Sequence, residues 1–168
     1  MNTSNRSRSP LRRRRRTAVA VIAAAAIGAG SLSPALAGAC AEPEETTALL
    51  VRALQSRLMV SALVCDTRAQ YNAFVTRYRP ALQHNGAVLI SYFGRSYGGE
   101  ATPRLNRFVT ALANDASVDS NADRAAFCDG AETTLAELDR RGEMRLDTLP
   151  LRALVPLPGV TDCRTAAR

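Results

Sequence analysis

Apolar residues recur every three or four positions through the central part of the chain, which is the spacing of one face of an α-helix. The first such stripe comprises Leu50, Val51, Leu54, Leu58, Ala62 and Cys65. An acidic stretch at residues 42–45 precedes it and suits the positive end of a helix dipole. We therefore expect a first helix over residues 46–65, with the sulfur of Cys65 pointing into the core.

Proline and glycine divide the next stretch into two segments. Asp66 is an acceptable N-cap for a second helix, whose apolar stripe comprises Tyr71, Phe74, Val75, Tyr78 and Leu82. Pro80 should kink or break this helix at Arg79, because proline lacks an amide hydrogen and clashes with the preceding turn. A third segment over residues 81–97 carries Leu82, Leu89 and Phe93 on one face, and Gly98-Gly99 should end it.

Two further helices are expected after this glycine pair. Thr102-Pro103 is a strong start signal, an N-cap with proline in the first helical position, and the stripe after it comprises Leu105, Phe108, Val109, Leu112 and Ala116. Residues 119–121 read as a turn, and Ser120 with Asp123 can form a capping box. The next helix carries Phe127, Cys128, Ala131, Leu135 and Leu138 and should stop near Gly142.

The pattern changes after Gly142, where leucines are interspersed with Pro150, Pro156 and Pro158. This predicts an extended or single-turn tail over residues 142–168 that packs on the helices. The expected fold is therefore all-α. It is a disulfide-stapled bundle of four to five helices with an extended proline-rich C-terminal tail, in a single domain over residues 38–168.

The N-terminal stretch has the order of a cleavable secretory signal peptide: five arginines at 12–16, an apolar run at 18–27 and a small-residue cleavage site ending at Ala37. The apolar run is shorter than the roughly 20 residues of a membrane span. We expect residues 1–37 to be removed, which leaves no membrane span after processing. An uncleaved anchor helix, a twin-arginine signal at Arg15-Arg16 and a lipoprotein acylated at Cys40 are the alternatives to general secretion of the unfolded chain.

Removal of this segment changes the charge balance. The whole chain has 22 arginines, no lysine and 15 acidic residues, and seven of the arginines but none of the acids precede Gly38. The remaining domain thus has 15 basic and 15 acidic residues, interspersed along the chain. A nucleic-acid-binding surface needs clustered basic residues, so that class of function is excluded.

The domain has four cysteines, Cys40, Cys65, Cys128 and Cys163. An even number in an exported chain predicts two disulfides in one of three connectivities. Cys65 and Cys128 both lie on apolar stripes, so we pair them across the core and expect Cys40–Cys163 to tie the two ends together. There is no Cys-x-x-Cys pair and only one histidine, His84, so no metal, haem or other cofactor is expected.

The segment over residues 92–99 holds three of the eight tyrosines and phenylalanines of the chain. Tyrosine and arginine anchor many protein interfaces, so Tyr92, Arg95 and Tyr97 are the candidate contact surface. The alternative is a helix end whose aromatic side chains pack inward. His84 is interpreted as a surface residue, and no catalytic residue is assigned.

Several short motifs resemble an uncharacterised family of small exported proteins of Gram-negative bacteria. The motifs are Cys65-x-x-Arg68-x-x-Tyr71-Asn72-x-Phe74-Val75, Tyr92-Phe93, Leu105-Asn106-x-Phe108-Val109-Thr110 and Phe127-Cys128. The resemblance covers residues 50–128 and is consistent with a Cys65–Cys128 disulfide. It implies no activity, no cofactor and no catalytic residue.

These features favour a non-enzymatic interaction or structural module of the bacterial envelope, periplasmic or secreted, whose partner is an unknown envelope protein or ligand. The alternative is a binder of a small apolar ligand or lipid between the helices, because the many alanines and the break at Pro80 permit an underfilled core. A third hypothesis is an envelope hydrolase with an unrecognised site, which replacement of His84 by alanine would test.

Overall fold

The computed structural model describes residues 40–141, 145–155, 157 and 160–163. The chain divides into two units, Met1–Ala35 and Leu36–Arg168, and the described residues all belong to the second. The predicted signal peptide over residues 1–37 lies outside the described residues and stays a prediction.

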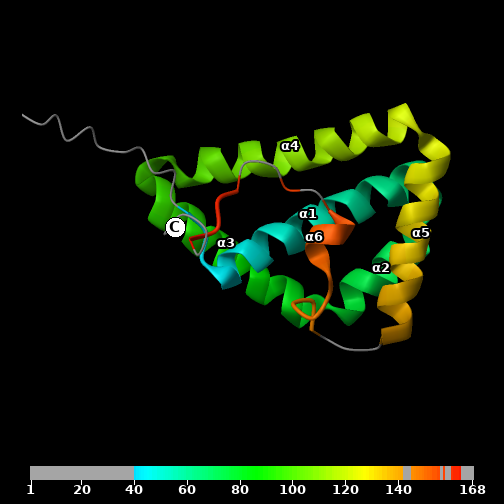
Figure 1. Cartoon of the computed structure of the whole chain (residues 1–168), viewed down its shortest axis with the longest axis horizontal. Helices are drawn as coiled ribbons and strands as arrows, with labels where there is room; N and C mark the ends of the chain where they lie inside the picture. Colours follow the sequence, from blue (N-terminus) through cyan, green and yellow to red (C-terminus); the bar gives the residue numbers. More distant parts are fainter. Residues whose placement is uncertain (1–39, 142–144, 156, 158–159, 164–168) are drawn as a thin grey trace, which may run out of the picture. The chain divides into compact units, whose positions relative to one another are not determined.

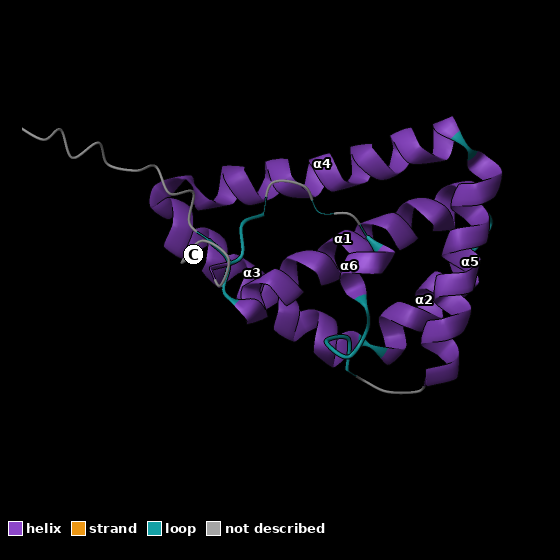
Figure 2. Ribbon diagram, in the orientation of Figure 1, coloured by secondary structure: helices purple, strands orange, loops and turns teal. Residues whose placement is uncertain are grey.

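The described part of the chain is all-α, as the spacing of apolar residues predicts (Figure 1; Figure 2). Its helices are α1 (Pro43–Val64), α2 (Arg68–Arg77), α3 (Arg79–Tyr97), α4 (Ala101–Ala122), α5 (Arg124–Arg141) and the single-turn α6 (Leu151–Leu154), with a 3₁₀ turn over Gly98–Glu100. Among these residues there is no strand, only an isolated parallel bridge between Ala41 and Asp162.

Helix α1 lies at the centre of the bundle and contacts every other described α-helix. In Figure 1 it runs between α4 on one side and α2 with α3 on the other, and α5 crosses one end. By length and composition α1 could cross a membrane, but 61 % of that apolar window is buried inside the bundle. Its composition is therefore accounted for by its place in the core.

The segment after α5 covers one side of α1. Leu146, Leu149, Leu151 and Val155 are buried in one cluster with α1 leucines 50, 54 and 58. The end of this segment pairs with the start of the domain, because the Ala41 amide donates to the Thr161 carbonyl at 2.9 Å and the Cys163 amide donates to the Ala41 carbonyl at 3.1 Å. The proline-rich tail was expected to be extended or to form one turn. The turn is α6, whereas Pro156 and Pro158 lie outside the described residues.

Both predicted disulfides are confirmed. Cys65–Cys128 joins the end of α1 to α5, with 5.5 Å between the Cα atoms. Cys40–Cys163 joins the two ends of the described chain, with a Cα–Cα distance of 4.8 Å. The described residues contain no free cysteine, so the disulfides indicate an oxidising, non-cytoplasmic compartment.

Two predicted N-cap residues do not cap a helix in the structure. Asp66 is not an N-cap: its φ of 59° places it in the left-handed turn between α1 and α2, and α2 starts after Thr67. Helix α4 begins at Ala101 rather than after Thr102, because the 3₁₀ turn over Gly98–Glu100 leads directly into it. Pro80 breaks the pattern as expected, and it occupies the first turn of α3.

The predicted turn at residues 119–121 is wrong, because α4 continues to Ala122. The Ser120 hydroxyl donates to the Ser117 carbonyl at 2.9 Å, and Arg57 of α1 holds Asp119 at 2.6 Å. Both contacts favour a helical continuation over a turn. The cap of α5 is Asp123 alone, whose Oδ1 accepts the Ala126 amide at 3.0 Å, so Ser120 forms no capping box.

Replacing both Cys40 and Cys163 by serine should lower the free energy of unfolding by about 4 kcal/mol, because the disulfide closes a loop with a sequence separation of 123. Urea unfolding of the oxidised protein measures this loss. The Ala41 amide should also exchange with solvent faster, because its partner segment is released. A double variant with the stability of the native protein would contradict the prediction.

Candidate ligand-binding groove

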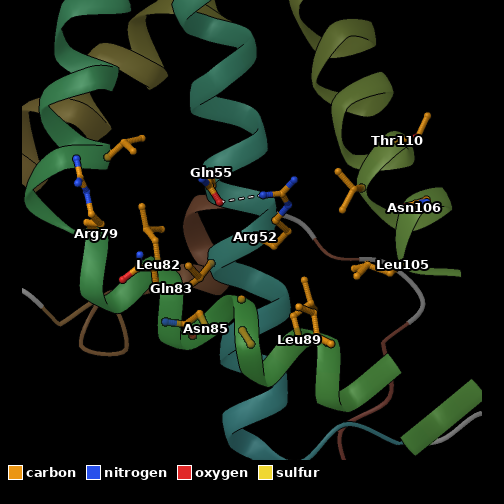
Figure 3. Close-up of a pocket in the computed structure, with 16 residues that line it drawn as sticks. Arg52, Gln55, Arg79, Leu82, Gln83, Asn85, Leu89, Leu105, Asn106 and Thr110 are labelled. Carbon is orange, nitrogen blue, oxygen red and sulfur yellow. Dashed lines mark hydrogen bonds between the residues drawn. The ribbon is translucent and has the colours of Figure 1, made fainter. Parts of the chain in front are cut away.

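A groove of about 620 Å³ lies between α1, α3 and α4, with one contribution from α2 (Figure 3). This volume is within the roughly 300–1,000 Å³ of small-molecule sites. The groove is lined by Ala48, Val51, Arg52 and Gln55 of α1, Val75 of α2, Arg79, Leu82, Gln83, Asn85, Gly86, Leu89 and Ile90 of α3, and Leu105, Asn106, Val109 and Thr110 of α4.

Two of the residues that line the groove are small, and they leave space that larger side chains would fill. Ala48 lies on α1 and Gly86 on α3, and a Cβ built on Gly86 would meet no atom within 4 Å. Apolar side chains surround this hollow, including the buried Leu89 and the 64 % exposed Ile90. An exposed isoleucine beside an unfilled apolar hollow suits an apolar ligand better than water.

Polar side chains form the rim of the groove. Arg52 donates from Nη1 to Oε1 of Gln55 at 3.1 Å, and Asn85 donates from Nδ2 to the Ala81 carbonyl at 2.7 Å. Figure 3 shows Arg52 extending from α1 on the side that faces α4, while Arg79 lies beyond Gln55 and Leu82 on the other side of α1.

The groove has a positive charge. Two arginines and no acidic residue line it. In the described part of the chain, neither Arg52 nor Arg79 forms an ion pair, and the buried Nε of Arg52 has no hydrogen-bond partner. The rim therefore carries two cations whose charges no carboxylate of the described residues neutralises.

Other hollows of similar size lack this combination. The hollow between α2 and α5 contains Arg77, but Asp139 pairs with it at 2.7 Å. Another hollow contains His84 and Arg145, and Glu44 and Asp147 of the same hollow bind them. In both hollows, a carboxylate of the same lining pairs with each of these basic side chains.

The three predicted contact residues are divided between the core and the surface. Tyr92 is only 7 % exposed and packs edge-to-face on Phe93, with ring centroids 5.2 Å apart. The Arg95 guanidinium forms two hydrogen bonds with Glu45, the shorter at 2.5 Å. Tyr97 is half-buried and stacks on Phe93. A contact surface at this helix end stays a prediction, and Tyr92 could contribute little to it.

Arg95 anchors the N-terminus of α1. Glu45 accepts the Glu42 amide at 2.8 Å in a capping box, and the same carboxylate receives the Arg95 side chain. Glu45 raises the pKa of Arg95 by this hydrogen bonding. The ion pair thus joins the end of α3 to the start of α1.

His84 lies on the surface, as predicted, and its Nε2 is 3.1 Å from Oε1 of Glu44. The described residues contain no group of three or more His, Cys, Asp or Glu side chains that could hold a metal ion. The groove lining contains no histidine, cysteine, serine, aspartate or glutamate.

Sequence reasoning missed the groove and Arg52. The available signals were weak: an arginine directly after Leu50 and Val51, and a glycine inside an apolar helical pattern at Gly86. Either residue alone is typical of many solvent-exposed helices.

Comparison of the chain with protein-family models, with curated proteins and with solved structures finds no match.

Arg95→Gln should lower the free energy of unfolding by about 1 kcal/mol, because the largely buried Glu45 carboxylate loses its charged partner. Denaturant unfolding at neutral pH measures the change. Arg107→Gln on α4 is the matched control, since Arg107 is exposed and has no ion pair among the described residues. Equal stability of the two variants would contradict an anchoring role for Arg95.

Stability should fall above pH 10 through Tyr92. Burial raises the pKa of the Tyr92 hydroxyl above its ordinary value of 10.0, and the nearby Tyr97 and Glu45 add to this. The unfolded chain therefore loses this proton at lower pH than the folded chain. The contribution is fully present below pH 10 and is lost as the pH rises through the folded pKa.

Urea unfolding between pH 9 and pH 11 measures this loss. Tyr92→Phe should show a smaller decline than the native protein over this interval, whereas an equal decline would contradict the prediction.

Proposed function

We propose that this chain is an exported, non-enzymatic binding protein of the bacterial envelope whose groove between α1, α3 and α4 holds a ligand with a single apolar chain. The observation that carries the proposal is the unfilled apolar hollow beside Ala48 and Gly86. Burial of each methylene group in such a hollow contributes about 0.8 kcal/mol, so a chain of several carbons would bind measurably.

Binding is favoured over catalysis by the chemistry of the lining. Its polar groups are guanidinium, amide and one hydroxyl, that of Thr110. Nucleophilic catalysis needs a nucleophile beside a general base, and the lining supplies no side chain that serves as a base near neutral pH.

The two disulfides support a location outside the cytoplasm. Within that constraint we propose the periplasm or the secreted fraction, with residues 1–37 as the export signal. The Cys40–Cys163 bond argues against a lipoprotein, because the sulfur that lipidation would acylate is already bonded to another sulfur.

Linear alkan-1-ols test the groove, because their heads are neutral and only the apolar chain varies. From hexan-1-ol to decan-1-ol, each added methylene should tighten binding roughly fourfold until the groove is full. Displacement of the neutral fluorescent probe N-phenyl-1-naphthylamine measures the affinities. Absence of any displacement would overturn the proposal.

A large side chain at Gly86 should block this binding. Gly86→Phe places a ring in the hollow, where a Cβ has open space, so the helix should tolerate it. Gly94→Phe is the matched control, because Gly94 also lies on α3 with open space around its Cβ but does not line the groove. We expect decan-1-ol affinity to fall at least tenfold in the first variant and to stay unchanged in the second. Equal affinities in the two variants would contradict binding in this groove.

A protein-interaction module is the second candidate. Met59 and Leu63 are 38 % and 67 % exposed, and the helical repeat places both on the side of α1 that carries Arg52. A partner helix could cover this apolar strip. In that case the native protein should be recovered from its envelope in a complex, and the double variant Met59→Gln, Leu63→Gln should be recovered as a monomer. The double variant should keep its affinity for decan-1-ol.

A further inference from the structure

We infer that the ligand of the groove is a single-chain amphiphile with a carboxylate head group, which Arg52 binds. This inference rests on the proposed function, because it assigns a head group to a ligand whose apolar chain occupies the groove. It commits the site to one class of ligand, fatty acids and chemically similar carboxylates.

The first support is the state of the Arg52 side chain. A guanidinium stays charged at any pH that a folded protein tolerates and has five N–H donors. In Arg52, Nη1 has the amide oxygen of Gln55 as an acceptor, while Nε is buried and has none. A buried donor without an acceptor costs free energy, and a rotation of the guanidinium toward a carboxylate in the groove would give the side chain an anionic acceptor and offset that cost.

The second support comes from comparison with the other arginines. Among the described residues only Arg52 and Arg57 are half-buried arginines, and the rest are exposed. Arg57 has a carboxylate partner in Asp119 at 2.6 Å and lies over the Phe127 ring. Arg52 has a neutral amide instead. The bundle thus neutralises one half-buried guanidinium and leaves the other, at the groove, without a counter-charge from the described residues.

The third support is the position of Arg52 relative to the apolar surface. The same groove that contains Arg52 is lined by Val51, Leu89 and Leu105, and Figure 3 places Arg52 at the side of α1 that faces α4. A head group at Arg52 therefore leaves the alkyl chain next to apolar side chains. The planar guanidinium matches the two oxygens of a carboxylate, and a cationic head would be repelled.

Three ten-carbon ligands with different heads test the inference at pH 8: decanoate, decan-1-ol and decylammonium. The two ionic ligands are kept below their micelle-forming concentrations and decan-1-ol below its solubility limit. We expect decanoate to bind about tenfold more tightly than decan-1-ol, because a hydrogen-bonded charge pair adds that much to the affinity. Decylammonium should bind more weakly than either. Displacement of N-phenyl-1-naphthylamine gives the three affinities. Equal affinities for the three ligands would overturn the carboxylate inference and leave the apolar groove intact.

Arg52→Gln identifies the residue responsible. The variant should bind decanoate about tenfold more weakly, whereas its decan-1-ol affinity should fall much less, because a neutral head group loses no charge pair. Retained decan-1-ol binding also shows that the variant is folded. Arg107→Gln is the control for net charge, because Arg107 lies outside the groove; its decanoate affinity should stay native. Arg79→Gln tests the other cation of the rim. Loss of the decanoate preference in Arg79→Gln or Arg107→Gln, but not in Arg52→Gln, would overturn the assignment.

Failure of the proposed function has a different signature. In that case none of the three ligands displaces the probe, or Gly86→Phe binds decan-1-ol as tightly as Gly94→Phe does.

Discussion

The burial of α1 on most of its sides is the constraint on which the rest of the fold depends. Val51, Leu54 and Leu58 lie on one side of this helix and Leu49 on the opposite side, and each is at most 2 % exposed. A single neighbouring helix covers only one stripe of another helix. Burial of α1 on most of its sides therefore requires contacts from α3, from α4, from α2 together with α5, and from the tail. The tail contributes only a short helix, and the Cys40–Cys163 bond holds its end beside the start of α1.

The fold could be predicted largely from the period of apolar residues. The stripe of α1 and the cysteines at Cys65 and Cys128 implied a shared core and the disulfide between them, and the structure contains both. The error at residues 119–121 has a tertiary cause. Asp, Ser and Asn favour turns locally, but the ion pair from Arg57 to Asp119 supports a continuous α4, and that contact spans 62 positions of sequence.

The groove could not be predicted in the same way. Residue type suggested a surface role for Arg95 and Tyr92, yet the first serves the junction of α1 and α3 and the second lies in the core. Conversely, Arg52 belongs to the polar face of α1, and sequence periodicity places that face in solvent. Arg52 borders a hollow only because α3 and α4 pack beside α1. The apolar pattern of one helix does not reveal how three helices pack together.

The tail, which covers one side of α1, is the last part of the domain to be synthesised. A chain is made from its N-terminus, so α1, the most extensively buried helix, is complete before any of its neighbours exists. Leu50 and Leu54 gain their contacts with Leu151 and Val155 only when nearly the whole domain has been made. Until then this apolar surface of α1 is exposed to other chains, and such exposure promotes aggregation. We therefore expect the incomplete domain to aggregate more readily than the finished one, which hides the surface responsible.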